Sequence, residues 1–400
     1  MSGITDMIYA DNAATTKLSK AALDAMMPYL EHAYGNPSSL HKEGQIARRA
    51  LDEARNDIAD ILNCSTQEIT FTSGGTEANN QAILTAVSDQ RNREKKHIVS
   101  TAFEHHSVLH MLKKLERSRF EVTLLDIPQD GIIRPQQVAE AVRDDTCLVS
   151  VMHANNEIGS IQPIDEIGLI CRERGIMFHT DAVQSTGHLP IDLGKNPIDL
   201  LSLSAHKFHG PKGIGILYAK RGIHPANLLE GGAQERGHRS GTENVAAIAG
   251  MAAALKEADR NMEANTAHTV QLRNRLIRGL ETIPHSILNG SRENRLPGNV
   301  NFCFEGIEGE TLLLLLDQKG ICASSGSACS AGSLEASHVL LALGLPRELA
   351  FGSLRLTINE GNTEEDIDRI IAAVAEGVAK LRESSPIWHD KLSGRKEYYL

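Results

Sequence analysis

Strand-like and helical patterns alternate along the first two-thirds of the chain, and this order limits the possible folds more than any other feature. The predicted strands are residues 68–72, 97–100, 121–125, 147–153, 177–179, 200–204 and 215–219. Helical spacing of apolar residues separates most of them, at 47–62, 76–90, 108–118, 135–143 and 164–174. Because strands joined by crossover helices pair in parallel, we expect a mainly parallel seven-stranded sheet flanked by helices in an α/β fold.

The pattern changes after a long Ala/Leu-rich helical stretch that starts near residue 246. The later predicted strands are 299–305, 321–323 and 353–358, and the later predicted helices are 311–318, 337–343 and 364–383. This mixture predicts a smaller α+β domain. We therefore assign residues 16–260 to a large domain and residues 1–15 and 261–400 to a small one. The polar segment 384–400 is expected to be partly disordered.

Composition, net charge and the length of the apolar runs argue against several classes of protein. The chain has 400 residues, of which 41% are hydrophobic and 23% charged, as in ordinary globular proteins. Its net charge of -10 argues against general nucleic-acid binding, which needs a basic surface. No apolar run is long enough to cross a membrane and no signal peptide is recognisable, so we expect no membrane partner and a cytoplasmic location.

The cysteines do not form a metal-binding pattern. Six are present, with no CxxC pair and no Cys/His spacing typical of zinc, so we predict free thiols and no intrinsic metal site. Cys147 and Cys303 lie in apolar strand-like runs and are expected to pack in the core, and Cys322 is expected to pack in a strand. Cys329 differs, because residues 324–333 around it are almost all small. A thiol on such a loop suits nucleophilic attack, although an incidental cysteine is the alternative.

Two glycines, Gly74 and Gly75, lie between a predicted strand and a predicted helix. Glycines allow a sharp turn and a close approach to a ligand, and a helix start favours an anion such as phosphate. A plain turn with a Thr or Ser cap explains the same residues equally well.

Asp181 and Lys207 each follow a predicted strand, and both are therefore expected at the carboxyl edge of the sheet, where ligands of α/β folds bind. A carboxylate there keeps a pyridinium nitrogen protonated, and a lysine amine forms Schiff bases. Taken singly, Asp181 is better explained as a helix cap and Lys207 as a solvated loop residue. The order of glycine turn, aspartate and lysine favours the functional interpretation.

These motifs, with several others in the same order, closely resemble those of cysteine desulfurases of the NifS/IscS type, which are class V aminotransferase-like, fold-type I pyridoxal-phosphate enzymes. The resemblance extends from about residue 9 to residue 382. The matching segments are residues 9–16, 35–39, 74–77, 104–105, 155–159, 179–184, 204–213, 239–242 and 324–329.

The resemblance implies a role for each matching residue. Lys207 would bond covalently to pyridoxal 5'-phosphate, Asp181 would pair with the ring nitrogen, and Gln184 with the phenolic oxygen. His105 would stack on the ring and move protons. The cofactor's phosphate would be held by a set drawn from two subunits: Gly75, Thr76, Ser204 and His206, with Thr242 of the other subunit. Asn156 and Arg355 would bind the substrate carboxylate.

The implied reaction removes sulfur from L-cysteine, leaving L-alanine and a persulfide on Cys329. The implied partners are a second copy of the chain and a sulfur acceptor, such as an iron–sulfur scaffold protein, with which Cys329 could ligate a cluster. A selenocysteine lyase or an aminotransferase-like enzyme is the nearer alternative, and a non-catalytic partner-binding scaffold the more distant one. The run 357–362 departs from the family pattern and puts Glu360 near the expected substrate arginine. His32, His41, His110 and His338 show no partner pattern and are expected to have surface or core roles.

Overall fold

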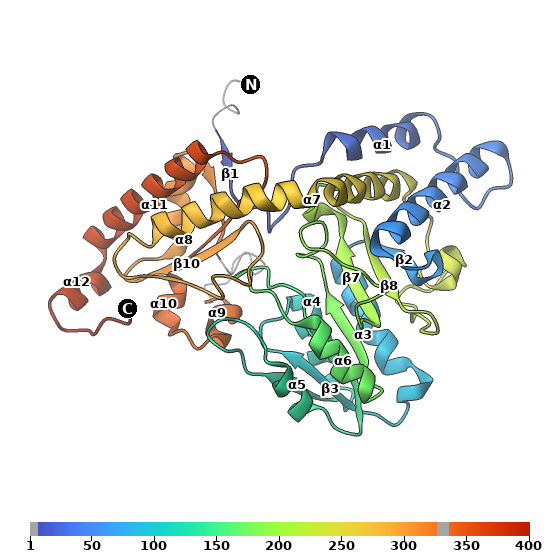
Figure 1. Ribbon diagram of the computed structural model, residues 1–400, viewed down its shortest axis with the longest axis horizontal. Helices are drawn as coiled ribbons and strands as arrows, with labels where there is room; N and C mark the ends of the chain where they lie inside the picture. Colours follow the sequence, from blue (N-terminus) through green and yellow to red (C-terminus); the bar gives the residue numbers. More distant parts are fainter. Residues whose placement is uncertain (1–6, 326–335) are drawn as a thin grey trace.

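The computed structural model describes residues 7–325 and 336–400, so the predicted nucleophile Cys329 lies outside the described residues (Figure 1). A seven-stranded sheet has the order β2-β8-β7-β6-β5-β3-β4. Neighbours from β7 to β4 pair in parallel, whereas β8 is antiparallel to both β2 and β7. The strands are β2 (Ile69–Thr72), β3 (His97–Thr101), β4 (Glu121–Leu125), β5 (Thr146–Ser150), β6 (Met177–Asp181), β7 (Leu200–Ser204) and β8 (Gly215–Ala219).

Helices cover both faces of this sheet, and successive strand residues enter different apolar clusters. Leu148 packs with residues of α3 and α4, whereas its neighbour Val149 packs on the opposite side with α2 and α6. This explains why the strands are apolar throughout rather than alternating. The covering helices are α2 (Lys42–Leu62), α3 (Gly75–Ser88), α4 (His106–Glu116), α5 (Pro135–Ala141) and α6 (Ile164–Glu173), with short 3₁₀ turns η1 (Thr66–Glu68), η2 (Gln90–Asn92), η3 (Ala205–Lys207) and η4 (Gln234–Gly237).

A second apolar core surrounds a smaller sheet at the opposite end of the molecule (Figure 1). Its antiparallel strands are β9 (Ser286–Leu288), β10 (Asn299–Phe304) and β12 (Ser353–Thr357), and a parallel pair joins β1 (Ile8–Tyr9) to β11 (Ile321–Cys322). The helices here are α8 (Gly309–Gln318), α9 (His338–Ala342), α10 (Arg347–Phe351) and α11 (Glu364–Ser384). The domain boundaries given above remain a prediction.

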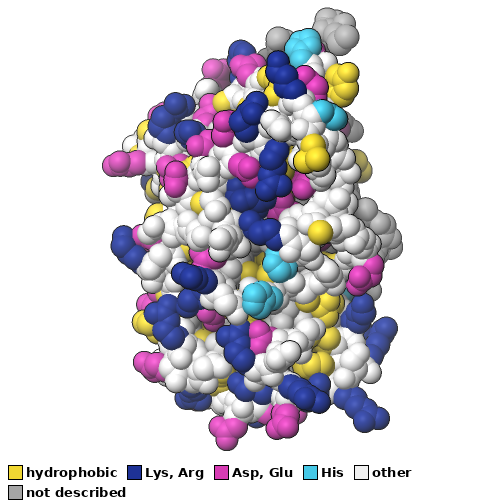
Figure 2. All heavy atoms as spheres, turned by 90° about the vertical axis from the view of Figure 1, so that its right-hand side faces the viewer, with side chains coloured by type: hydrophobic (Ala, Val, Ile, Leu, Met, Phe, Trp, Pro, Cys, Tyr) yellow, Lys and Arg dark blue, Asp and Glu magenta, His cyan; other side chains and the backbone are white. Residues whose placement is uncertain are grey.

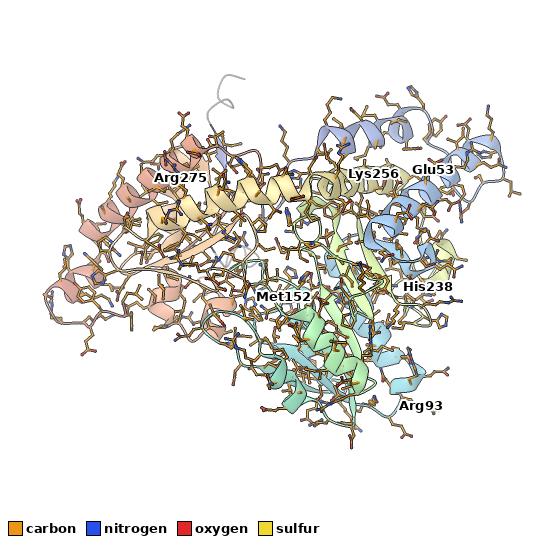
Figure 3. The ribbon with its side chains drawn as sticks, viewed as in Figure 1. Glu53, Arg93, Met152, His238, Lys256 and Arg275 are labelled. Atoms are coloured by element: carbon orange, nitrogen blue, oxygen red, sulfur yellow. The ribbon has the colours of Figure 1, made fainter. Side chains whose placement is uncertain are left out.

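One helix, α7 (Val245–Leu280), extends along both parts of the molecule, with α1 (Lys20–Glu31) packed against its first half. In Figure 3, Lys256 of α7 lies over the large sheet and Arg275 over the small one. Lys256 pairs with Asp57 of α2 at 3.1 Å, and Arg275 pairs with Asp368 of α11 at 2.7 Å. The helix is buried near both ends. Its middle is half-buried to exposed, because it lies between the two cores and lines a cavity there.

The C-terminal segment differs from the sequence expectation of disorder. It forms α12 (Pro386–Leu392), and Lys391 becomes buried against Glu305 with an Nζ–Oε1 distance of 2.6 Å. The backbone N–H of Tyr399 donates to the same carboxylate at 2.7 Å. Glu305, a buried residue directly after β10, thus binds two residues of the polar C-terminal segment and holds this segment in place.

Positive and negative side chains are interspersed over the face drawn in Figure 2. Within residues 7–325 and 336–400, no helix combines the length and apolarity needed to span a membrane. Cys147 and Cys303 are buried, as predicted.

Candidate active site

The carboxyl edge of the large sheet brings together residues from four separate strands. Gly74 follows β2, His105 follows β3, Asp181 is the last residue of β6, and Lys207 follows β7. Because these strands run in the same direction, their carboxyl ends lie along one edge. The predicted convergence of the glycine turn, the aspartate and the lysine is therefore observed.

The turn after β2 has the geometry of an anion cradle. Gly74 has φ of 148° and caps α3 without a side-chain hydrogen bond, so the first amides of α3 lack helical acceptors. A Cβ on Gly75 would lie 2.6 Å from Cγ2 of Val183, and a Cβ on Gly74 would lie 3.7 Å from Oγ of Ser204. The site thus combines unsatisfied N–H groups, the helix dipole and a serine hydroxyl, which fits a phosphate group.

Asp181 is only 4% exposed, yet its carboxylate is well satisfied. Its Oδ1 accepts from the Val183 N–H at 3.0 Å, and its Oδ2 accepts from Nδ2 of Asn79 at 2.6 Å. Each oxygen retains a further lone pair. A buried carboxylate with spare acceptor capacity fits the protonated nitrogen of a pyridine ring.

Lys207 and Gln184 are held at the same backbone segment. The Lys207 Nζ donates to the carbonyls of Ala13 and Ala14 at 2.6 and 2.8 Å, and Nε2 of Gln184 donates to the Ala13 carbonyl at 3.0 Å. His206 lies beside them, with Nδ1 3.1 Å from Oγ1 of Thr15. Burial, with smaller contributions from Lys207 and Lys212, lowers the pKa of His206 to about 4, so this ring is neutral near pH 7.

His105 is the N-cap of α4 and a polar neighbour of the site. Its Nδ1 accepts from the Ser107 N–H at 3.1 Å and lies 2.7 Å from Oγ of Ser107. Burial lowers the pKa of His105; Asp181 opposes this effect, and Lys207 adds to it. The imidazole is therefore biased toward its neutral form.

Arg355, at the centre of β12, extends from the small sheet toward these residues. Its Nη2 donates to Asp11 at 3.0 Å and its Nη1 to the carbonyl of Asn156 at 3.2 Å. Its Nε is buried without a partner among the described residues, so the guanidinium has donor capacity for a carboxylate. The backbone of Arg355 also bonds to Ser324, at the start of the run that carries Cys329.

The remaining predicted residues are less closely grouped. Thr76 is exposed on the first turn of α3, and Thr242 is exposed on the wall of a separate cavity of about 200 Å³ that Ser73 and Arg239 also line. Arg239 pairs with Glu77, beside Thr76, at 3.0 Å. Lys207 is not among the residues that line this cavity.

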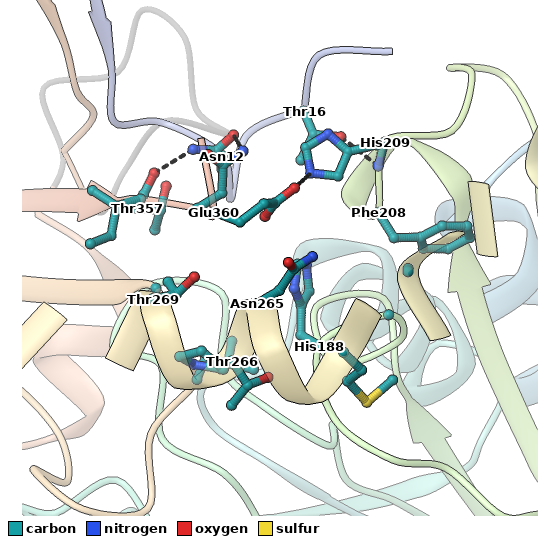
Figure 4. Close-up of a pocket in the computed structure, with 18 of the residues that line it drawn as sticks. Asn12, Thr16, His188, Phe208, His209, Asn265, Thr266, Thr269, Thr357 and Glu360 are labelled. Atoms are coloured by element: carbon teal, nitrogen blue, oxygen red, sulfur yellow. Dashed lines mark hydrogen bonds and ion pairs between the residues drawn. The ribbon is translucent and has the colours of Figure 1, made fainter. Parts of the chain in front are cut away.

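A second cavity of about 330 Å³ lies between the middle of α7 and the loop after β12 (Figure 4). Glu360 crosses it to His209, with a 3.1 Å distance between Oε1 and Nε2. Glu360 therefore pairs with His209 rather than with Arg355, which pairs with Asp11.

Several residues near the site were not anticipated from the sequence. Asn79, Ser107 and Asp11 contact predicted residues, and the buried Glu157 accepts a short hydrogen bond from Ser337. The rings of His110 and His338 both contact the ring of His106, at centroid distances of 5.0 and 4.6 Å. Helical spacing from Gly75 could have placed Asn79 on the inner face of α3; nothing in the sequence links Asp11 to Arg355.

No cluster of three or more potential metal ligands occurs in the part of the chain that the structure describes. The candidate site offers a lysine amine, a buried carboxylate, an anion cradle and an arginine, and these groups fit a pyridoxal-phosphate cofactor.

Comparison with known proteins defines the family. Residues 8–370 match the family model described as aminotransferase class-V, and the chain belongs to this family. A protein from Methanosarcina thermophila named cysteine desulfurase IscS is 51% identical over 380 residues, covering 95% of this chain and 94% of that protein. A solved NifS-like protein superposes with a TM-score of 0.88 at 36% identity, covering 94% of this chain and all of that one. A structure described as SspA in complex with cysteine has a TM-score of 0.77 at 37% identity, covering 88% and 98%.

Proposed function

We propose that this chain is a pyridoxal-phosphate-dependent cysteine desulfurase. The near full-length similarity to a protein named cysteine desulfurase IscS supports this, and so does the class-V aminotransferase family model. The observation that carries the proposal is the convergence of Lys207, Asp181 and the uncapped start of α3 at one sheet edge, opposite Arg355.

The residues described above account for each part of the cofactor. Lys207 would bond to its aldehyde carbon, Asp181 would pair with the ring nitrogen and Gln184 with the phenolic oxygen. The phosphate would lie at the start of α3 among Gly75, Thr76, Ser204 and His206, with Thr242 supplied by a second copy of the chain. When bound, the pyridinium ring withdraws electrons from the substrate Cα.

The chain's own side chains perform the remaining steps. Arg355 and Asn156 bind the L-cysteine carboxylate, because the buried guanidinium has an unused Nε–H. The Lys207 Nζ takes the Cα proton, and His105 stacks on the cofactor ring and moves protons beside it. The Cys329 thiolate attacks the substrate Sγ, and the Cβ–Sγ bond breaks with its electron pair left on the carbon skeleton. One proton added at Cβ completes the methyl group, and the return of a proton to Cα gives alanine. Sulfur remains on Cys329 as a persulfide.

The partners remain proposals of the same kind. A homodimer would bring Thr242 to the other subunit's phosphate, and an acceptor such as an iron–sulfur scaffold protein would take the sulfur, with Cys329 able to ligate a cluster in that complex. The SspA structure described as bound to cysteine supports L-cysteine as the substrate class. A cytoplasmic location stays a prediction.

The deciding experiment measures sulfide and alanine formed from L-cysteine, with pyridoxal phosphate and a reductant, for the wild type, Cys329→Ala and Cys322→Ala. Cys322, on β11, is the matched control because it is a second, half-buried thiol in the same part of the chain. We expect loss of activity only in Cys329→Ala. Equal activity in all three would exclude a Cys329 persulfide and point to direct elimination by the cofactor. No activity in any would favour a non-catalytic scaffold, or an enzyme with another substrate, such as a selenocysteine lyase or an aminotransferase-like enzyme.

A further inference from the structure

A continuous chain of hydrogen bonds links two of the candidate site residues through two that have no assigned role. Asn79 Nδ2 donates to Asp181 Oδ2 at 2.6 Å and to Ser107 Oγ at 2.9 Å. Ser107 Oγ then lies 2.7 Å from Nδ1 of His105. Asn79 is 1% exposed and Ser107 is 7% exposed, so water does not replace these contacts.

The direction of every bond in this chain follows from its two fixed ends. A carboxylate only accepts, so the amide nitrogen of Asn79 must face Asp181, and the same nitrogen donates its other hydrogen to Ser107. At the far end, the backbone N–H of Ser107 points at His105 Nδ1, at 3.1 Å. A hydrogen on Nδ1 would oppose this N–H. The Ser107 hydroxyl therefore donates to Nδ1, and the neutral ring carries its hydrogen on Nε2.

From this geometry we infer that Asn79 and Ser107 are positioning residues that hold His105 as the Nε2–H tautomer and couple its orientation to Asp181. The inference rests on the proposed function, in which His105 and Asp181 face the cofactor. It makes the neutral resting ring of His105 a hydrogen-bond donor through Nε2–H, rather than a base that takes a proton from Cys329 at Nε2.

The charged and titratable neighbours of His105 are consistent with a neutral resting ring. Burial lowers its pKa; Asp181 on β6 favours the cation, whereas Lys207 after β7 and His110 on α4 oppose it. His106 and His338 likewise disfavour a second positive charge beside them. The adjacent Glu104 is fully buried, and burial raises its pKa to about 8, so it adds little negative charge near pH 7.

The direct test is the nitrogen NMR spectrum of the histidine-labelled holoenzyme, with the His105→Gln variant identifying the His105 signals. We expect the wild-type ring to be protonated at Nε2, the Ser107→Ala ring to be a mixture of tautomers, and Ser107→Thr to restore the wild-type pattern. The matched control is Ser150→Ala, which removes a similar buried serine–histidine contact, 2.9 Å from Nδ1 of His179, outside the candidate site. A wild-type ring protonated at Nδ1 would overturn the inference, even if Ser107→Ala failed to fold.

Kinetics supply an independent readout. In Ser107→Ala we expect kcat for L-cysteine to fall about 10- to 100-fold, which is less than the complete loss of a general acid–base contribution, with KM unchanged. Without the Ser107 hydroxyl donating to Nδ1, protonation of the His105 ring becomes easier. The acidic limb of the pH–rate profile should therefore move to higher pH. Unchanged kcat and pH profile in Ser107→Ala would refute the positioning role. If the wild type released no sulfide, the proposed function would fail, and the NMR result would still decide the tautomer.

Discussion

The two sides of the candidate site are built in different ways. The cofactor side uses residues at the ends of parallel strands between β2 and β7, where each side chain is placed by the local strand–helix order. The substrate side depends on Arg355, whose partner Asp11 lies 344 residues away in the sequence. Local order can therefore fix the cofactor side, whereas the substrate side forms only when distant segments assemble.

The largest expected effect tests the cofactor side. Lys207→Ala removes both the covalent attachment point and the base, so we expect L-cysteine desulfuration to fall by more than about 1,000-fold. The measurement is sulfide release together with the absorbance of bound cofactor. Lys212→Ala, in the same loop, is the control and should retain activity. A comparable loss of activity in both variants would indicate that the substitutions disturb the loop, and not that the Lys207 amine itself is required.

The next prediction concerns the stability of the small core, which includes β12 and therefore Arg355 on the substrate side. Lys391→Ala leaves Glu305 buried with one charge partner fewer, because both side chains are only 1% exposed. We expect unfolding to become easier by about 3 kcal/mol, measured by urea denaturation. Lys396→Ala breaks the half-exposed pair with Glu348 and should cost less than about 1 kcal/mol. Equal losses of unfolding free energy in the two variants would mean that the buried Lys391–Glu305 pair stabilises the small core no more than an exposed ion pair does.

A smaller effect separates binding from chemistry. Arg355→Lys keeps the charge but removes the planar fork, so we expect KM for L-cysteine to rise about 10-fold with a smaller change in kcat. Steady-state kinetics measure both, and Arg275→Lys, on the exposed pair with Asp368, is the control. A change in kcat alone would contradict a role in holding the substrate carboxylate.

The smallest expected effect concerns the ion pair between His209 and Glu360, which crosses the cavity between α7 and the loop after β12. Burial alone would lower the pKa of His209, but the hydrogen bond to Glu360 outweighs it, and the pKa is raised above 6.5. Burial alone would raise the pKa of Glu360, but His209 outweighs it, and the pKa is lowered below 4.5. The histidine contribution is complete below pH 6.5 and lost as pH rises through its raised value. The glutamate contribution is complete above pH 4.5 and lost as pH falls through its lowered value.

Glu360→Gln should therefore lower thermal stability most between about pH 4.5 and 6.5 and least above pH 8. Melting temperatures across this range measure the difference, and Asn359→Ala, in the same loop but uncharged, provides the comparison. A stability loss that does not vary with pH would show that the pair is not ionised in the folded chain.

The fold and the cofactor side were largely accessible from the sequence. The seven strands, their mainly parallel pairing and the placement of Asp181 and Lys207 followed from apolar runs and from motif order, and the family membership and α/β fold are confirmed. The roles of the site residues remain predictions. The tail prediction was wrong because its order comes from Glu305, which lies about 80 residues upstream of α12 and carries no local signal.

The sequence by itself determined which chemical groups are present and at which strand ends they occur, because strand periodicity and motif order are local properties. Only the tertiary structure decided how those groups are oriented. Asn79 could not be linked to Asp181, nor Asp11 to Arg355, from spacing alone. A hydrogen bond is set by the distance and direction between atoms. For segments far apart in the chain these are fixed only by tertiary packing, of α3 against β6 for Asn79 and of the segment after β1 beside β12 for Asp11.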